Sequence, residues 1–188
     1  MSNPIFQPAD ARVSRVPRVL IVKPEKSYLG VLARRIAENG YRIAIAETVQ
    51  AAVAELYRQP VDIILSELRG PSFNGAELLG IIREDAILRD IPFLLFAGRS
   101  DRPAAIRALR NGADAIVNKP FHFEVLCARI ARELQRKRAI EDLRSSNQTL
   151  DARVVERAIA VGELKDRLAS SEAERRRLEI MVASTSSQ

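Results

Sequence analysis

Apolar and polar positions alternate along the first two thirds of the chain in a pattern that predicts short buried strands separated by helices. Residues 18–22 read Arg-Val-Leu-Ile-Val, a short apolar run typical of a parallel strand buried on both faces. Residues 27–39 follow with a helical spacing of apolar positions, and Asn39-Gly40 marks the end of that helix. Further strands are predicted at 41–46, 61–66, 91–96 and 115–118, and further helices at 48–58, 76–84, 102–111 and from His122.

Five strands alternating with five helices predict an α/β fold, a doubly wound five-stranded parallel sheet. In such sheets the working crevice lies at the carboxyl ends of the strands. The positions of interest therefore follow Val22, Ser66, Phe96 and Asn118.

Beyond residue 121 the pattern is that of one long helix. No proline follows Pro120 and Gly162 is the only glycine there, so nothing interrupts a helix over 122–182. Positions spaced alternately four and three apart form a seam: Leu143, Asn147, Leu150, Val154, Arg157, Val161, Leu164, Leu168, Ser171, Arg175, Leu178 and Val182. Most are apolar, which predicts a coiled coil, and Asn147 at the first heptad position favours a parallel homodimer. The alternative is a surface helix that folds back onto the domain.

The same pattern divides the chain into four segments. Residues 1–17, with three prolines, are predicted to be a flexible lead-in, and residues 18–136 the α/β domain. Residues 137–182 are predicted to form a dimerisation helix continuous with the last helix of the domain, followed by a disordered tail at 183–188.

Composition narrows the function classes. The single cysteine, Cys127, allows no internal disulfide and favours a cytoplasmic location, and no apolar run is long enough to cross a membrane. The net charge of +6 divides equally between residues 1–128 and 129–188, with both signs interspersed. This distribution favours a mixed-charge surface over a nucleic-acid interface, although DNA or RNA binding by the basic C-terminal helices stays open as an alternative.

Four segments resemble the receiver domain of two-component response regulators: VLIVKPE, DIILSELRGPSFNG, IPFLLFAGRSD and NGADAIVNKPF. The resemblance implies the strand order 2-1-3-4-5. It also implies a phosphoacceptor Asp after the third strand, an acidic pair after the first, a Thr or Ser after the fourth and a Lys after the fifth. Carboxylates of this kind hold Mg²⁺, while the Lys and the hydroxyl neutralise the transferring phosphoryl group.

This sequence departs from that pattern at most of these positions. Lys23 and Pro24 stand at the acidic pair, Glu67 at the phosphoacceptor, Ala97 at the hydroxyl, Ile116 at the aromatic switch, and only Lys119 and Pro120 match. An ammonium group repels a divalent cation and a proline offers it no side-chain ligand. We therefore predict a degenerate receiver that has no metal site, cofactor, catalytic residues or phosphotransfer. A noncanonical phosphoryl-accepting regulator is the alternative.

These substitutions can compensate one another. Lys23, Glu67 and Lys119 are expected to meet in the crevice, where Glu67 would accept hydrogen bonds from both ammonium groups. Such a network predicts one locked conformation.

The helix sequence LDARVVERAIAVGELKDRLASSEAERRRLE resembles the signalling helices that link bacterial sensor or receiver modules to output domains. Since the sequence stops at residue 188, output is expected through dimerisation or contact with another protein. The predicted function is a dimeric adaptor or modulator in two-component signalling, with a histidine kinase or another response regulator as partner.

Overall fold

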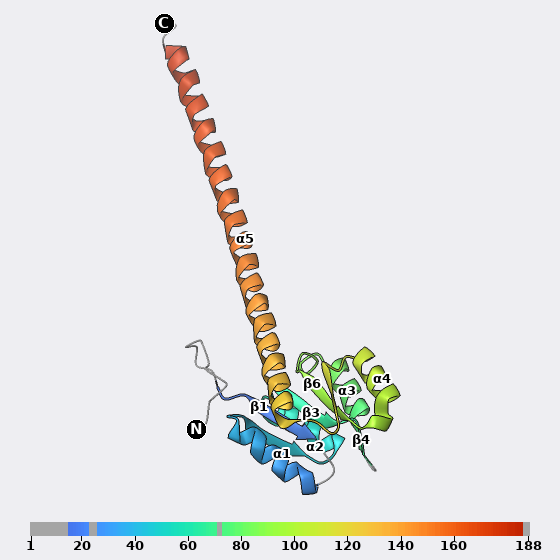
Figure 1. Cartoon of the computed structure of the whole chain (residues 1–188). Coiled ribbons are helices and arrows are strands. Elements are labelled where there is room, and N and C mark those ends of the chain that lie inside the picture. Colours follow the sequence, from blue (N-terminus) through green and yellow to red (C-terminus); the bar gives the residue numbers. More distant parts are fainter. Residues whose placement is uncertain (1–14, 23–25, 71–72, 186–188) are drawn as a thin grey trace. The chain divides into compact units, whose positions relative to one another are not determined.

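The computed structural model describes residues 15–22, 26–70 and 73–185, and the chain forms two compact units, Met1–Arg138 and Ala139–Gln188. The first unit contains a parallel five-stranded sheet in the order β2-β1-β3-β6-β7 (Figure 1). Its strands are β1 (Arg18–Val22), β2 (Arg42–Ala46), β3 (Ile63–Glu67), β6 (Phe93–Ala97) and β7 (Ala115–Asn118). The predicted fold class and strand order are confirmed.

The connecting helices begin and end where local chemistry favours it. They are α1 (Lys26–Glu38), α2 (Val49–Arg58), α3 (Gly75–Glu84), the short 3-10 helix η1 (Arg99–Asp101), α4 (Arg102–Arg110) and α5 (Phe123–Thr185). Thr48 caps α2 because its hydroxyl accepts a hydrogen bond from the Ala51 amide at 3.1 Å. After α4, Gly112 adopts a φ of 97°, a left-handed conformation that side chains disfavour.

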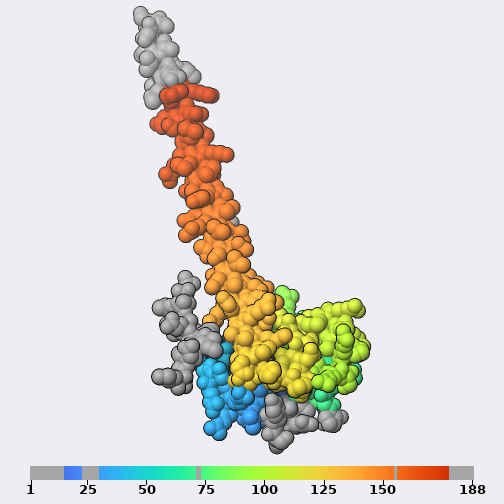
Figure 2. Space-filling model, viewed as in Figure 1, coloured from blue at the N-terminus to red at the C-terminus, as the bar shows by residue number. Residues whose placement is uncertain are grey.

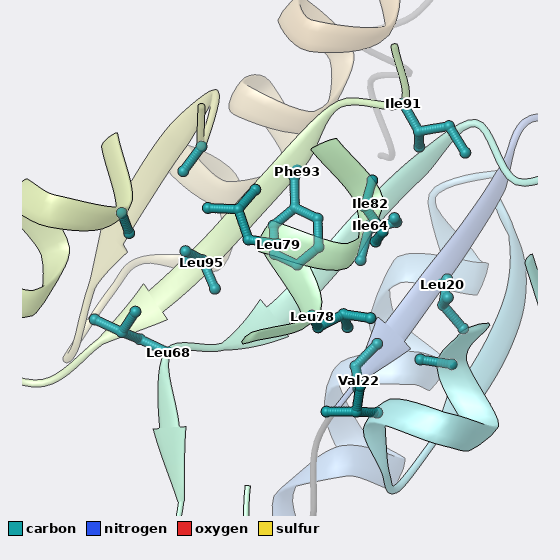
Figure 3. Packing of buried hydrophobic residues seen from close by; sticks show 14 of the residues in the cluster. Leu20, Val22, Ile64, Leu68, Leu78, Leu79, Ile82, Ile91, Phe93 and Leu95 are labelled. Carbon is teal, nitrogen blue, oxygen red and sulfur yellow. The ribbon is translucent and has the colours of Figure 1, made fainter. Parts of the chain in front are cut away.

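Two apolar cores cover the two faces of the sheet. On one face Leu20, Ile64 and Phe93 of the strands pack against Leu79 and Ile82 of α3 (Figure 3). The other face packs against α1 and the first turns of α5. All five residues of β1, β3 and β6 are buried, which explains the apolar runs in these strands, while Arg18, Ser66 and Glu67 are the buried polar residues at their ends. Each fully buried Leu, Ile or Phe contributes about 1.5–3 kcal/mol of transfer free energy.

The sequence pattern missed a small antiparallel ladder between β3 and α3. It joins β4 (Arg69–Gly70) to β5 (Phe73–Asn74), and the Phe73 side chain is buried in the core. Two-residue strands have no alternation to detect, so only a tertiary contact identifies them.

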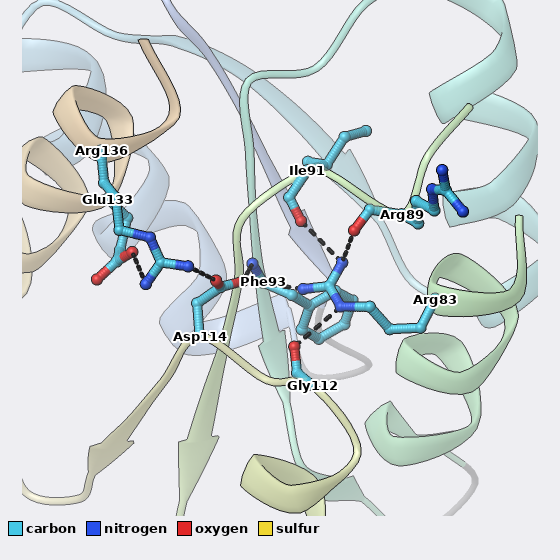
Figure 4. A network of polar contacts seen from close by, with 8 residues as sticks. All are labelled: Arg83, Arg89, Ile91, Phe93, Gly112, Asp114, Glu133 and Arg136. Atoms are coloured by element: carbon cyan, nitrogen blue, oxygen red, sulfur yellow. Dashed lines mark hydrogen bonds and ion pairs between the residues drawn. The ribbon is translucent and has the colours of Figure 1, made fainter. Parts of the chain in front are cut away.

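A network of hydrogen bonds and ion pairs connects residues at the amino-terminal ends of β6 and β7 (Figure 4). Arg83 of α3 donates to the carbonyl oxygens of Gly112, Arg89 and Ile91 at 2.8–3.0 Å and to Oδ2 of Asp114 at 2.8 Å. The Asp114 carboxylate also accepts from the Phe93 amide at 2.8 Å and from Arg136 of α5 at 2.9 Å. One carboxylate therefore connects α3, β6 and α5.

The second unit is the part of α5 from Ala139 onward. The helix has 63 residues in all, which confirms a long C-terminal helix. Its residues 139–185 extend about 70 Å at about 1.5 Å per residue. Within this unit the described leucines and valines of the seam are 50–66% exposed. No helix among the described residues is long and apolar enough to cross a membrane.

Candidate functional site

The register of the sheet brings three predicted site residues together at the carboxyl ends of the strands. Glu67 is the last residue of β3, Ala97 the last of β6, and Lys119 directly follows β7. Phe96 pairs with Glu67 and Asn118 with Ala97, and the Lys119 amide donates to the Ala97 carbonyl at 2.8 Å. The carboxyl ends of the three strands therefore meet at one site, for which we keep the name crevice.

An ion pair fills the centre of that crevice. The Lys119 Nζ lies 2.6 Å from both carboxylate oxygens of Glu67. The Glu67 side chain is 9% exposed and that of Lys119 is 36% exposed. Charge-assisted hydrogen bonds of this length are among the stronger polar contacts in proteins.

Aromatic rings line one side of the pair. Phe96 and Phe121 stack with ring centroids 5.2 Å apart, and the Lys119 ammonium lies 6.0 Å from the Phe96 ring. No role for Phe121 in the crevice was predicted from the sequence. The signal in the sequence was that Phe121 follows Lys119-Pro120 directly after a predicted strand. Residues that directly follow a strand can lie beside the end of the neighbouring strand.

A close backbone approach positions Glu67 from the other side. The Gly75 amide donates to the Leu68 carbonyl at 3.0 Å. A Cβ at residue 75 would lie 1.9 Å from the Glu67 carbonyl oxygen, so only glycine fits there. The buried Ser66 hydroxyl donates to the same carbonyl at 3.0 Å.

The remaining predicted positions differ in what the structure places there. The Ala97 side chain is 1% exposed and belongs to the apolar core, while Ile116 is half-buried against that core. Lys23 and Pro24 lie outside the described residues, so a contact between Lys23 and Glu67 stays a prediction.

The described donor set does not fit Mg²⁺. Among the described residues, no three His, Cys, Asp or Glu side chains cluster closely enough to hold a metal ion. Glu67 is the carboxylate that ends β3, and both of its oxygens accept from Lys119. Mg²⁺ takes several oxygen ligands in near-octahedral geometry, which one carboxylate does not supply.

Two other residues considered from the sequence lie away from this chemistry. His122 is exposed, and Cys127 is half-buried on α5. Burial raises the pKa of the Cys127 thiol, with a smaller contribution from Glu124, so the thiol stays protonated.

Comparison with known proteins assigns the chain to a family. The response regulator receiver domain family matches residues 19–131, and the chain belongs to this family. The phosphate regulon transcriptional regulatory protein PhoB of Klebsiella pneumoniae is 29% identical over 119 residues, 63% of this chain and 52% of that protein. The chain thus spans about half the length of that relative.

Other relatives agree with this class. The C4-dicarboxylate transport transcriptional regulatory protein DctD of Pseudomonas aeruginosa is 27% identical over 95% of this chain and 36% of its own length. The solved signal receiver domain of a signal transduction histidine kinase from Syntrophus aciditrophicus is 28% identical, with a TM-score of 0.59 over 64% of this chain and 91% of that one. The chain thus contains the receiver domain of a two-component response regulator.

Gly75→Ala tests the close approach to Glu67. Because the added methyl meets a backbone carbonyl, we expect the free energy of unfolding to fall by about 1–3 kcal/mol. Urea unfolding followed by tyrosine fluorescence reports on the first unit, since all three tyrosines precede residue 58. Gly80→Ala is the matched control, because a Cβ there meets nothing within 4 Å. It should stabilise α3 by up to about 1 kcal/mol, and equal losses in both variants would contradict the proposed crowding.

A double-mutant cycle measures the ion pair. Lys119→Met should lower the free energy of unfolding by about 1–2 kcal/mol, a range that allows for the partial exposure of the ammonium group. Glu67→Gln/Lys119→Met should cost less than the sum of the single changes, because each single change removes the contact while one of the two charges remains. Additive costs in the same tyrosine-monitored unfolding experiment would show that the two groups are not coupled.

Proposed function

We propose that this protein is a pseudo-receiver, a response regulator that works without receiving a phosphoryl group. The observation that carries the proposal is what stands around Glu67: the buried methyl group of Ala97 occupies the hydroxyl position, and the described residues hold no group of three side chains that could bind a metal ion. Phosphoryl transfer to a carboxylate needs a metal-neutralised donor and groups that receive the phosphoryl oxygens. Of these parts the described crevice retains Lys119, which contacts both oxygens of Glu67.

The sequence beside β1 strengthens the argument. Lys23 and Pro24 follow this strand, at the positions where the family has its acidic pair. A positive charge there opposes Mg²⁺ binding, and one glutamate cannot supply the set of hard oxygen ligands that this ion needs.

The switch that reports phosphorylation also lacks its usual parts. The resemblance to active receivers implies a hydroxyl where Ala97 stands and an aromatic ring where Ile116 stands. A buried methyl group donates no hydrogen bond to a phosphoryl oxygen, and the Ile116 side chain packs against the core. We infer one constitutive conformation, held by the Glu67–Lys119 pair.

Output then depends on association with proteins. The heptad positions of residues 139–185 support a parallel homodimer: Asn147, Val154 and Val161 occupy first positions, and the fourth positions hold leucine at 143, 150 and 164 and arginine at 157. β-Branched residues at the first heptad position with leucine at the fourth favour two strands, and an asparagine fixes the register. The exposure of these apolar residues in a single chain supports burial by a second copy. Leu178 lies outside the residues whose side chains are described.

The resulting function is that of a dimeric adaptor in two-component signalling. A receiver held in one conformation can occupy a histidine kinase or another response regulator without accepting its phosphate. Membership of the receiver family supports this class of partner.

Magnesium titration tests the crevice. We expect the native protein to show no saturable Mg²⁺ binding by calorimetry and no mass gain at Glu67 after incubation with acetyl phosphate. Lys23→Asp/Pro24→Asp/Glu67→Asp rebuilds the carboxylate set and should bind Mg²⁺ measurably. Saturable binding to the native protein, or a phosphoryl group on Glu67, would defeat the pseudo-receiver proposal.

Light scattering on the full chain tests the dimer. Leu150→Lys/Leu164→Lys places charges in the seam and should halve the mass, since buried like charges repel. Ile159→Lys is the control, because residue 159 lies off the seam and is 59% exposed. Asn147→Leu should keep association but broaden the distribution of oligomers. An unchanged mass in the seam variant would contradict the coiled coil.

A further inference from the structure

A small group of exposed apolar side chains lies where α2 and α3 end. Tyr57 of α2 is 58% exposed, and Ile81 of α3 is 40% exposed. Ile87 follows α3 and is 78% exposed, the highest value among the large apolar side chains of the described residues. Because α2 and α3 contact each other, the three side chains belong to neighbouring elements. We call these three residues the α2–α3 surface.

The Asp85 carboxylate holds the parts of this surface together. The Tyr57 hydroxyl donates to Oδ2 of Asp85, and the Ile87 and Leu88 amides donate to Oδ1 at 2.7 and 2.9 Å. Ile81 precedes Asp85 by about one helical turn and lies on the same side of α3. The tyrosine hydrogen bond lowers the pKa of Asp85 and raises the pKa of Tyr57, so at neutral pH the carboxylate stays ionised and the hydroxyl stays a donor. A surface held in this way loses little conformational entropy when a partner binds.

The α2–α3 surface is separate from the crevice and from α5. α2 and α3 pack on one face of the sheet, whereas α1 and the first turns of α5 pack on the other. In Figure 2 the blue side chains of α1 and the gold side chains of α5 fill much of the visible face of the first unit. α2 and α3 end near the amino ends of β3 and β6, while the crevice lies at the carboxyl ends of the strands.

Unpaired carboxylates flank the apolar side chain of Ile81. Glu77 and Glu84 are exposed and lie about one turn to either side of it on α3. Among the described residues neither glutamate forms an ion pair. The guanidinium group of Arg83 is held by the network in Figure 4. Residues 75–90 contain four Asp or Glu against two arginines, so this part of a chain with net charge +6 is acidic.

We propose that the α2–α3 surface binds a basic segment of another protein, with an apolar side chain of that segment packed between Tyr57 and Ile87. Charge complementarity selects this occupant, because two copies meeting through this surface would oppose glutamate with glutamate. The same carboxylates repel the phosphates of nucleic acids and of anionic lipids. Tyrosine is also among the residues that contribute most to the affinity of protein interfaces. The inference goes beyond the proposed function and does not require it, because the surface contains no residue of the crevice or of the seam.

Fluorescence anisotropy on the full chain tests this surface. The probe is a fluorescein-labelled peptide of lysine and leucine, and the control peptide has glutamine in place of lysine. The native protein should bind the lysine peptide with an affinity that falls as salt rises, and it should bind the glutamine peptide at least about tenfold more weakly. Tyr57→Ser/Ile87→Ser should weaken binding of the lysine peptide about tenfold or more. Thermal unfolding followed by circular dichroism verifies that the variant folds.

Val31→Ser/Ile45→Ser is the matched control, because these side chains of α1 and β2 are 55% and 48% exposed. It should leave the affinity for the lysine peptide within about threefold of native. Glu77→Gln/Glu84→Gln removes the carboxylates beside Ile81 without adding charge. It should lower the affinity about threefold or more and reduce its dependence on salt.

Three results would overturn the proposal. Equal losses in Val31→Ser/Ile45→Ser, or no loss in Tyr57→Ser/Ile87→Ser, would show that the peptide binds elsewhere. Equal affinity for the lysine and glutamine peptides would exclude a basic occupant. A lower mass of Tyr57→Ser/Ile87→Ser than of the native protein by light scattering would assign the surface to self-association instead. The titrations contain no Mg²⁺ or acetyl phosphate, so none of these results depends on the pseudo-receiver proposal.

Discussion

The crevice depends on the contact between Lys119 and Glu67. Three parallel strands end at one edge of the sheet, and the side chains that follow them converge. Glu67 is buried there, and a buried carboxylate is costly unless a cation or several hydrogen-bond donors compensate for lost water. Lys119 supplies the cation from within the chain, and its ammonium group contacts both oxygens. Removing one member of such a pair is more costly than replacing both members with apolar side chains of similar volume.

That constraint also explains the tight packing around Glu67. Gly75 approaches the Glu67 carbonyl too closely for any side chain, and the stacked rings of Phe96 and Phe121 border the ammonium group. Glu67 has little freedom to move, because Gly75 packs against its backbone and Lys119 contacts its carboxylate oxygens. The geometry therefore favours a fixed crevice, consistent with the proposed loss of switching.

The sequence predicted the parts of the fold that depend on local pattern. Continuous apolar runs located the buried strands, and a stretch with no proline and one glycine, Gly162, located the long helix. The same residues carried the resemblance to receivers, so Glu67 and Lys119 could be expected to meet. The β4–β5 ladder and the Phe96–Phe121 stack were not predicted, because each joins residues whose proximity depends on tertiary packing. Arg83 is the clearest case: its partners Gly112 and Asp114 lie about thirty residues away, and a surface arginine on α3 gives no local sign of them.

Arginine placement follows the same logic and links the crevice to the surface. Arg83 and Arg136 occupy Asp114 at the amino-terminal ends of the strands, which leaves the neighbouring arginines of α4 and α5 without that carboxylate. At the opposite ends of the strands, Glu67 is occupied by Lys119. Both acidic groups are thus neutralised inside the domain, and the positive charge that remains lies outside it. A domain whose own cations neutralise these two carboxylates needs no metal ion or phosphoryl group to complete the contacts, which is the condition that the proposed pseudo-receiver function requires.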